Sequence, residues 1–293
     1  MPGDPVTLLI RDPRLPEAIK QQVRVTFGLD KPLYVQFVTY LFNVFQGQLG
    51  YSFVYRTPVA DLLWSRVQNT IPLVLGGNLL AIGIGVLAGV ITAWKRGSRI
   101  DSVGQTIVLS LYSVPYFFFG MSTLMVLVLF MGANVPVGGM GISGMAYPNI
   151  YDQLADYLRH LAIPMLVYAL GASGAYGLIV RNVMVEVLSE DYITTSRAKG
   201  LKERTIMFGT ALRNASLPLI TLVALNLGFV VGGAIEIETV FSWPGIGLLV
   251  YHSVLSRDYP VLQGAFLLLT MTVILANLFA DILYFHLDPR VRQ

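Results

Sequence analysis

The chain has 293 residues, of which 55% are hydrophobic and only 13% are charged, and its mean hydropathy is +0.65. A soluble domain usually carries about 25% charged residues, so this composition excludes an ordinary soluble protein. The net charge of +3 argues against nucleic-acid binding, and the lack of cysteine excludes disulfides and thiolate metal sites. The three histidines are scattered and predict no metal site. We expect an all-α integral membrane protein.

Residues 1–70 are polar and contain neither a signal peptide nor a leading hydrophobic helix. We expect them to form an extracytoplasmic N-terminal region. Because the sequence opens abruptly with MPGDP, we expect a first transmembrane helix to be missing from this chain, so that the full protein has six. The alternative is a five-helix chain whose N-terminal region is drawn across the membrane by the first hairpin. The aromatic residues of this region are expected to serve packing: Tyr34, Phe37, Tyr40, Phe42 and Phe45.

Five stretches are apolar enough to cross a hydrocarbon layer of about 30 Å, which takes roughly 20 residues. Together they predict a polytopic bundle over residues 71–286. Pro115 should kink the second stretch. Glycine-rich runs such as GIGVLAG and GASGAYG are expected to let helices pack closely. The predicted spans are 71–93, 104–131, 160–180, 214–235 and 259–285.

Basic residues are concentrated in two connections, 94–101 and 181–213, whereas 132–158 has no Lys or Arg and 236–258 has only Arg257. Short basic loops stay in the cytoplasm, so both basic connections and the tail 287–293 are predicted to be cytoplasmic.

The centres of the predicted spans lack Asp, Glu, Lys and Arg, which ion-coupled carriers usually keep at membrane depth. Asn78 and Asn226 are expected to make interhelical hydrogen bonds. Glu236, Glu238 and Asp281 lie near span ends, where solvation at the interface is expected. No catalytic motif and no GxxxxGK[ST] phosphate loop is present, so a partner must supply the energy for active transport.

The most informative segment is the polar, basic connection 190–213. Ser189 is expected to cap a helix over Glu190–Lys199, and Gly200 to end it in the left-handed conformation. Leu201 should then pack inward, with a second helix starting at Lys202 or Glu203. The alternative is an ordinary basic loop without a dedicated partner.

The residues DYITTSRAKG and LRNASLP, with the spacing from Gly200 to Leu217-Pro218, resemble the cytoplasmic loop of permease subunits of binding-protein-dependent ABC importers. The external stretch 238–268, the tail motif Asp288-Pro289-Arg290 and PGDP at 2–5 also agree. Together they resemble the B-type subunit of the dipeptide, oligopeptide and nickel permease family. This chain departs from the family in lacking the first transmembrane helix. It also has Thr194-Thr195-Ser196 where Glu-Ala-Ala is common.

The resemblance implies the fold of a type I ABC importer permease, in which 190–213 is a coupling hairpin that docks on a cytoplasmic ATPase. It implies two such ATPases, a second permease subunit of the C-type, and an extracytoplasmic solute-binding protein. The substrate would be a peptide or a related solute, and the location a prokaryotic inner membrane. It implies no catalysis, cofactor, metal or nucleic acid for this chain. The implied docking residues are Thr194, Thr195, Ser196, Arg197, Ala198, Lys199, Gly200 and Leu201, with Leu217 and Pro218 at the hairpin end.

Two other classes of function remain open on the sequence alone. A self-sufficient secondary carrier would need charged sites within the membrane, and a membrane scaffold would not need an intact hairpin for solute uptake.

Overall fold

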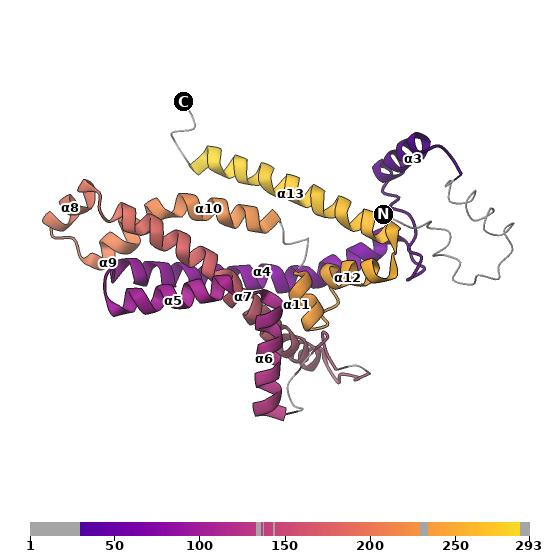
Figure 1. Cartoon of the computed structure of the whole chain (residues 1–293), viewed down its shortest axis with the longest axis horizontal. Coiled ribbons are helices and arrows are strands. Elements are labelled where there is room, and N and C mark those ends of the chain that lie inside the picture. The colour runs from indigo at the N-terminus through magenta and orange to yellow at the C-terminus, as the bar shows by residue number, and fades with distance from the viewer. Residues whose placement is uncertain (1–29, 133–135, 137, 143, 229–233, 288–293) are drawn as a thin grey trace.

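The computed structural model describes residues 30–132, 136, 138–142, 144–228 and 234–287. Over these residues the chain is an elongated bundle of helices (Figure 1). The long helices α4, α5, α10 and α13 follow the long axis, and α6 leaves the bundle sideways beside the start of α7. The helices are α3 (Leu33–Phe45), α4 (Val59–Trp94), α5 (Arg99–Ser113), α6 (Tyr116–Met131), α7 (Ile150–Val187), α8 (Asp191–Ala198), α9 (Glu203–Thr205), the π-helix η2 (Ile206–Ala211), α10 (Leu212–Gly228), α11 (Ile235–Val240), α12 (Ile246–Ser256) and α13 (Tyr259–Leu287).

Helices α4 and α7 form the centre of the bundle and pack closely through glycines. A Cβ atom on Gly85 would lie 2.6 Å from the carbonyl oxygen of Ser173, and one on Gly89 would lie 2.8 Å from that of Gly177. Contacts this short exist only where a side chain is absent, so the two backbones approach each other directly. The prediction that the glycines of these runs serve helix packing is confirmed for Gly85 and Gly89, but not for Gly83, which has no neighbour within 4 Å of a Cβ.

Gly85→Ala is expected to destabilise the protein, whereas Gly83→Ala should leave it unchanged or stabilise it by up to about 1 kcal/mol. The reason is steric: a Cβ at Gly85 meets the α7 backbone, but a Cβ at Gly83 meets nothing within 4 Å. Overpacking of this kind costs about 1–3 kcal/mol. The measurement is the melting temperature of each purified variant in detergent. Equal melting temperatures would contradict the packing described here.

The second predicted span, 104–131, is not one kinked helix. It is broken into α5 and α6, whose axes are bent by 104°. Pro115 lacks an N–H group, and the residue before it, Val114, has the extended conformation (φ −78°, ψ 124°) that a following proline favours. The position of the irregularity was predicted correctly, but its size was underestimated.

Several predicted boundaries also move. α4 has 36 residues and α7 has 38, so at 1.5 Å per residue they are about 54 and 57 Å long, well beyond the hydrocarbon thickness. The border between 1–70 and 71–286 therefore falls inside α4, and the helix that holds the third predicted span begins at Ile150 rather than at 160. Hydropathy detects only the apolar part of a helix, and the prolines near the two predicted starts, Pro72 and Pro164, lie inside continuous helices.

In the described residues three helices are long and apolar enough to cross a membrane, or four if the bent pair α5–α6 is one span. The predicted span 214–235 overlaps α10, which has 17 residues. The same predicted span includes residues 229–233, which lie outside the described residues. Most of the predicted tail 287–293 also lies outside them. The number of crossings therefore remains a prediction.

Helix α3 does not use its aromatic residues for packing as expected. Tyr34, Phe37, Phe42 and Phe45 are all more than half exposed, and only Tyr40 is partly buried. The packing at this end comes instead from the loop before α4, where Ser52 Oγ donates to Asp258 Oδ2 at 2.5 Å. The backbone N–H of Val54 donates to the same carboxylate at 3.1 Å.

Candidate functional site

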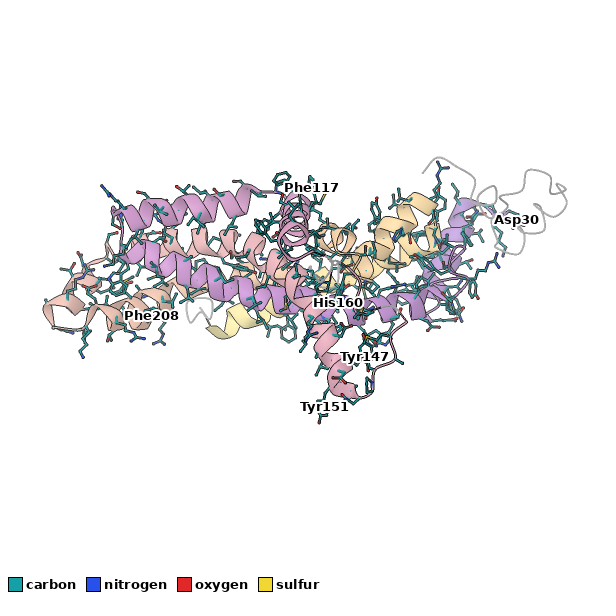
Figure 2. The ribbon with its side chains drawn as sticks, turned by 90° about the horizontal axis from the view of Figure 1, so that it is seen from below. Asp30, Phe117, Tyr147, Tyr151, His160 and Phe208 are labelled. Carbon is teal, nitrogen blue, oxygen red and sulfur yellow. The ribbon has the colours of Figure 1, made fainter. Side chains whose placement is uncertain are left out.

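The predicted hairpin lies at one end of the molecule. α8 and α9 lie at the same end of the long axis as the connection between α4 and α5, and opposite to α3 and α12 (Figure 1). The two basic connections found in the sequence, 94–101 and 181–213, are thus neighbours in space. Phe208, just after α9, lies at this end too (Figure 2).

Helix α8 is anchored by one apolar residue and one tyrosine. Ile193 is fully buried, as are Ile206 and Met207 of the following segment. The Tyr192 hydroxyl accepts a hydrogen bond from Asn214 Nδ2 at 3.2 Å, which links α8 to the start of α10. These anchors were missed in the sequence analysis, although Tyr192-Ile193 is the only pair of large apolar side chains in an otherwise polar helix.

The predicted docking residues are one continuous stretch of chain, Thr194–Leu201, which we call the docking surface after that prediction. All of them are exposed except Ser196, which is half-buried and donates through Oγ to the carbonyl oxygen of Tyr192 at 2.8 Å. Leu201 was expected to pack inward, but 45% of it is exposed. The inward packing that was assigned to Leu201 is made by Ile193 instead.

The C-terminal end of α8 agrees with the prediction from the sequence, but the N-terminal end does not. Gly200 has φ +76°, so the predicted left-handed residue is confirmed, and its N–H donates to the carbonyl oxygen of Arg197 at 2.9 Å. Ser189 is not the N-cap. Glu190 is at the cap without a side-chain bond, and Ser189 Oγ donates to the carbonyl oxygens of Val185 and Glu186. Helix α7 ends at Val187, so the Ser189 hydroxyl serves its last turn.

The segment that joins the hairpin to α10 is a π-helix over Ile206–Ala211, which the sequence did not predict. A π-helix, with hydrogen bonds from residue i to i+5, is rare in proteins and is frequently found at functional sites. Leu217 and Pro218 lie inside α10 and not at its entry, so the predicted hairpin end is displaced into the helix. Pro218 removes one backbone donor there.

An ion pair ties α5 to α7 close to the hairpin. Arg181 Nε donates to Asp101 Oδ1 at 3.1 Å, and Arg181 Nη2 donates to Asp101 Oδ2 at 3.2 Å. This is the bidentate geometry that gives strong arginine–carboxylate pairs. Asp101 also accepts from the Gly97 N–H at 3.0 Å and from Gln105 at 2.8 Å. The carboxylate is nearly fully buried.

Glu238 is not solvated at an interface, as was expected, but fully buried. Thr70 Oγ1 donates to one carboxylate oxygen at 2.8 Å and the Leu248 N–H donates to the other at 3.0 Å. Burial raises the pKa of this carboxyl. A Cβ on Gly245 would lie 2.4 Å from the carboxylate, and one on Gly247 would lie 3.0 Å from it. Glycine at these two positions therefore lets the backbone approach the Glu238 carboxylate closely. Glu236, by contrast, is exposed as expected.

Two polar residues of the predicted spans take part in one chain of hydrogen bonds. Asn226 Nδ2 donates to the Tyr176 hydroxyl at 2.9 Å, and that hydroxyl donates to Asn78 Oδ1 at 3.0 Å. Asn78 Nδ2 then donates to the Tyr168 hydroxyl at 3.1 Å. The expectation that both asparagines make interhelical hydrogen bonds is confirmed, since the chain connects α4, α7 and α10.

Comparison with known proteins agrees with this arrangement. A family model described as binding-protein-dependent transport system inner membrane component matches residues 85–293. The oligopeptide transport system permease protein AppB of Bacillus subtilis (strain 168) is 38% identical, over 99% of this chain and 90% of that protein. The dipeptide transport system permease protein DppB of Escherichia coli (strain K12) is 34% identical, over 100% of this chain and 91% of that protein.

The fold is also similar to a solved structure. A chain of the MetNI methionine ABC transporter in an inward-facing conformation superposes with a TM-score of 0.62 at 18% identity, over 78% of this chain and 96% of that chain. At this identity the likeness concerns the fold alone. The chain therefore belongs to the family of inner membrane components of binding-protein-dependent transport systems, as a transmembrane permease subunit.

Proposed function

We propose that this chain forms half of the translocation path of an ATP-driven importer for peptides or a closely related solute. The observation that carries the proposal is near full-length similarity to proteins named as oligopeptide and dipeptide permeases. The sequence contains no phosphate loop and no catalytic motif, so this subunit would be passive, with ATP hydrolysed by its partners.

The docking surface Thr194–Leu201 would be the contact with the ATPase. Its exposed side chains are mostly small, which suits a short helix lying in a cleft of another protein. Ile193 and Tyr192 hold α8 on the membrane domain. A displacement of α8 would therefore be transmitted to α10 through the Tyr192–Asn214 hydrogen bond and through η2.

The assembly we propose has two permease subunits, this chain and a C-type partner, with two cytoplasmic ATPases and an extracytoplasmic solute-binding protein. The docking surface and the tail would face the cytoplasm of a prokaryotic cell. The proximity of the two basic connections supports this orientation, since both then lie on one side of the inner membrane.

The test of this function is uptake of peptides by vesicles that contain the complete transporter and its binding protein. We expect uptake that requires ATP and that persists when an uncoupler dissipates the proton gradient. Uptake without ATP that collapses with the uncoupler would identify a secondary carrier instead.

A further inference from the structure

The hydrogen-bond chain of Asn226, Tyr176, Asn78 and Tyr168 lies beside a cavity between the helices. The cavity has a volume of about 150 Å³. Its walls come from α4, α5, α6, α7 and α10, and they bear no charged side chain. The lining residues of this polar cavity include Asn78, Tyr112, Tyr116, Tyr168, Ala175 and Asn226.

A second cavity, of about 320 Å³, adjoins the first on the side of α11. Tyr116 and Tyr168 line both cavities, and their rings are stacked with centroids 5.8 Å apart and an angle of 20° between planes. The pair is therefore a wall that the two spaces share, and we call it the tyrosine partition. Glu236 lines the second cavity and is the only charged side chain among the described residues that line either one.

The break between α5 and α6 lines the polar cavity as well, through Leu111, Val114 and Tyr116. Non-helical backbone at membrane depth is tolerated only where it is buried in protein or lines a water-filled space. A 104° break is thus unexpected beside lipid but expected where backbone is buried in protein or lines a water-filled space, and the polar cavity is such a space.

The directions of the hydrogen bonds show what the polar cavity offers to a solute. Asn78 donates to the Tyr168 hydroxyl, so the hydrogen of that hydroxyl remains able to donate to a molecule in the cavity. Asn226 uses its amide nitrogen on Tyr176, and among the described residues its amide oxygen has no bond partner. One donor and one acceptor on facing helices match the C=O and N–H groups of a peptide unit.

We propose that the polar cavity is a solute subsite that binds the peptide units of a transported peptide through Tyr168 and Asn226. The stacked pair Tyr116–Tyr168 acts as the partition that the solute passes, and Glu236 favours cationic groups on the other side. Gly171 makes the partition possible, because a Cβ there would lie 2.5 Å from the Tyr116 ring. This inference rests on the proposed peptide importer and says where in its membrane domain the solute is bound.

The test uses the complete transporter in proteoliposomes, with a library of di- to pentapeptides as solute and mass spectrometry of the imported peptides. Tyr168→Phe keeps the ring stacking but removes the hydroxyl, which is the donor to the solute and also the acceptor for Asn78. We expect import to fall about tenfold while ATP hydrolysis stays within about twofold of wild type. Glu236→Gln should lower the share of Lys- and Arg-containing peptides. Tyr157→Phe, on the same helix but outside both cavities, is the matched control and should import normally.

Thiol labelling gives a second measurement, because the chain has no cysteine of its own. Ala175→Cys, in the polar cavity, should react with a water-soluble thiol reagent, and the peptide library should slow the reaction. Ala155→Cys, at an exposed position outside the predicted spans and outside both cavities, should react as well but show no such protection.

The outcomes separate the two proposals. If wild type imports no member of the library with ATP, the peptide importer is wrong and the subsite falls with it. If wild type imports peptides but Tyr168→Phe imports them equally well, or loses import and ATP hydrolysis together, the subsite is wrong and the importer stands. Labelling at Ala175→Cys that peptides leave unchanged would also overturn the subsite.

Discussion

Ala198→Trp is expected to abolish ATP-driven uptake while the protein still inserts into the membrane. Ala198 is exposed on the docking surface, so an indole there has no contact to break within this chain. Against a closely packed ATPase, the extra volume would cost at least the 1–3 kcal/mol typical of overpacking, which is about a five- to hundredfold loss of docking. The measurements are peptide uptake, ATP hydrolysis and co-purification of the ATPase with the permease.

Ala155→Trp is the matched control, because it makes the same change at an exposed alanine near the start of α7, away from the hairpin. Gly200→Pro should fail like Ala198→Trp, since proline cannot adopt the φ of +76° and cannot donate to the Arg197 carbonyl. Normal coupling in both hairpin variants would show that Thr194–Leu201 is an ordinary loop.

Arg181→Leu is expected to destabilise the protein by about 3–5 kcal/mol, because it leaves the buried Asp101 carboxylate without its counter-charge. Asp101 would keep its bonds from Gly97 and Gln105, but these neutral donors do not replace a guanidinium. The measurement is the unfolding midpoint of the purified variant in detergent, with uptake expected to fall in parallel.

The control for this variant is a second arginine–carboxylate pair of similar distance but different exposure. Arg197 Nε lies 2.9 Å from Glu203 Oε1, and both side chains are about half exposed. Arg197→Leu should therefore change the free energy of unfolding by no more than about 1 kcal/mol. Equal effects of the two substitutions would mean that burial of the Asp101 pair contributes nothing.

The class of fold and the hairpin were predictable because each depends on local features. Apolar length predicts membrane helices, and a glycine between polar helical residues predicts the left-handed end that Gly200 has. The interhelical bonds of Asn78 and Asn226 followed from the cost of an unpaired amide in a membrane. In each case the physical argument needs only the residue and its immediate surroundings.

Features that depend on distant contacts were not predictable. Glu238 was predicted to be an interfacial carboxylate, because its hydrogen bonds from Thr70 and Leu248 depend on the tertiary structure. Leu201 was expected to pack inward, and the burial of Ile193 was missed because it depends on where Ile206 and Met207 of η2 lie. The π-helix and the size of the bend at Pro115 likewise depend on what the neighbouring helices allow.

The close contact between α4 and α7 has a mechanical consequence. The contact extends from Gly177 as far as Tyr168, because a Cβ on Gly77 would lie 2.6 Å from the Tyr168 ring. Asn78 of α4 also donates to the Tyr168 hydroxyl at 3.1 Å. Two helices joined over this length would move as one rigid body, so the tyrosine pair would travel with α4 and α7 together and not by bending between them.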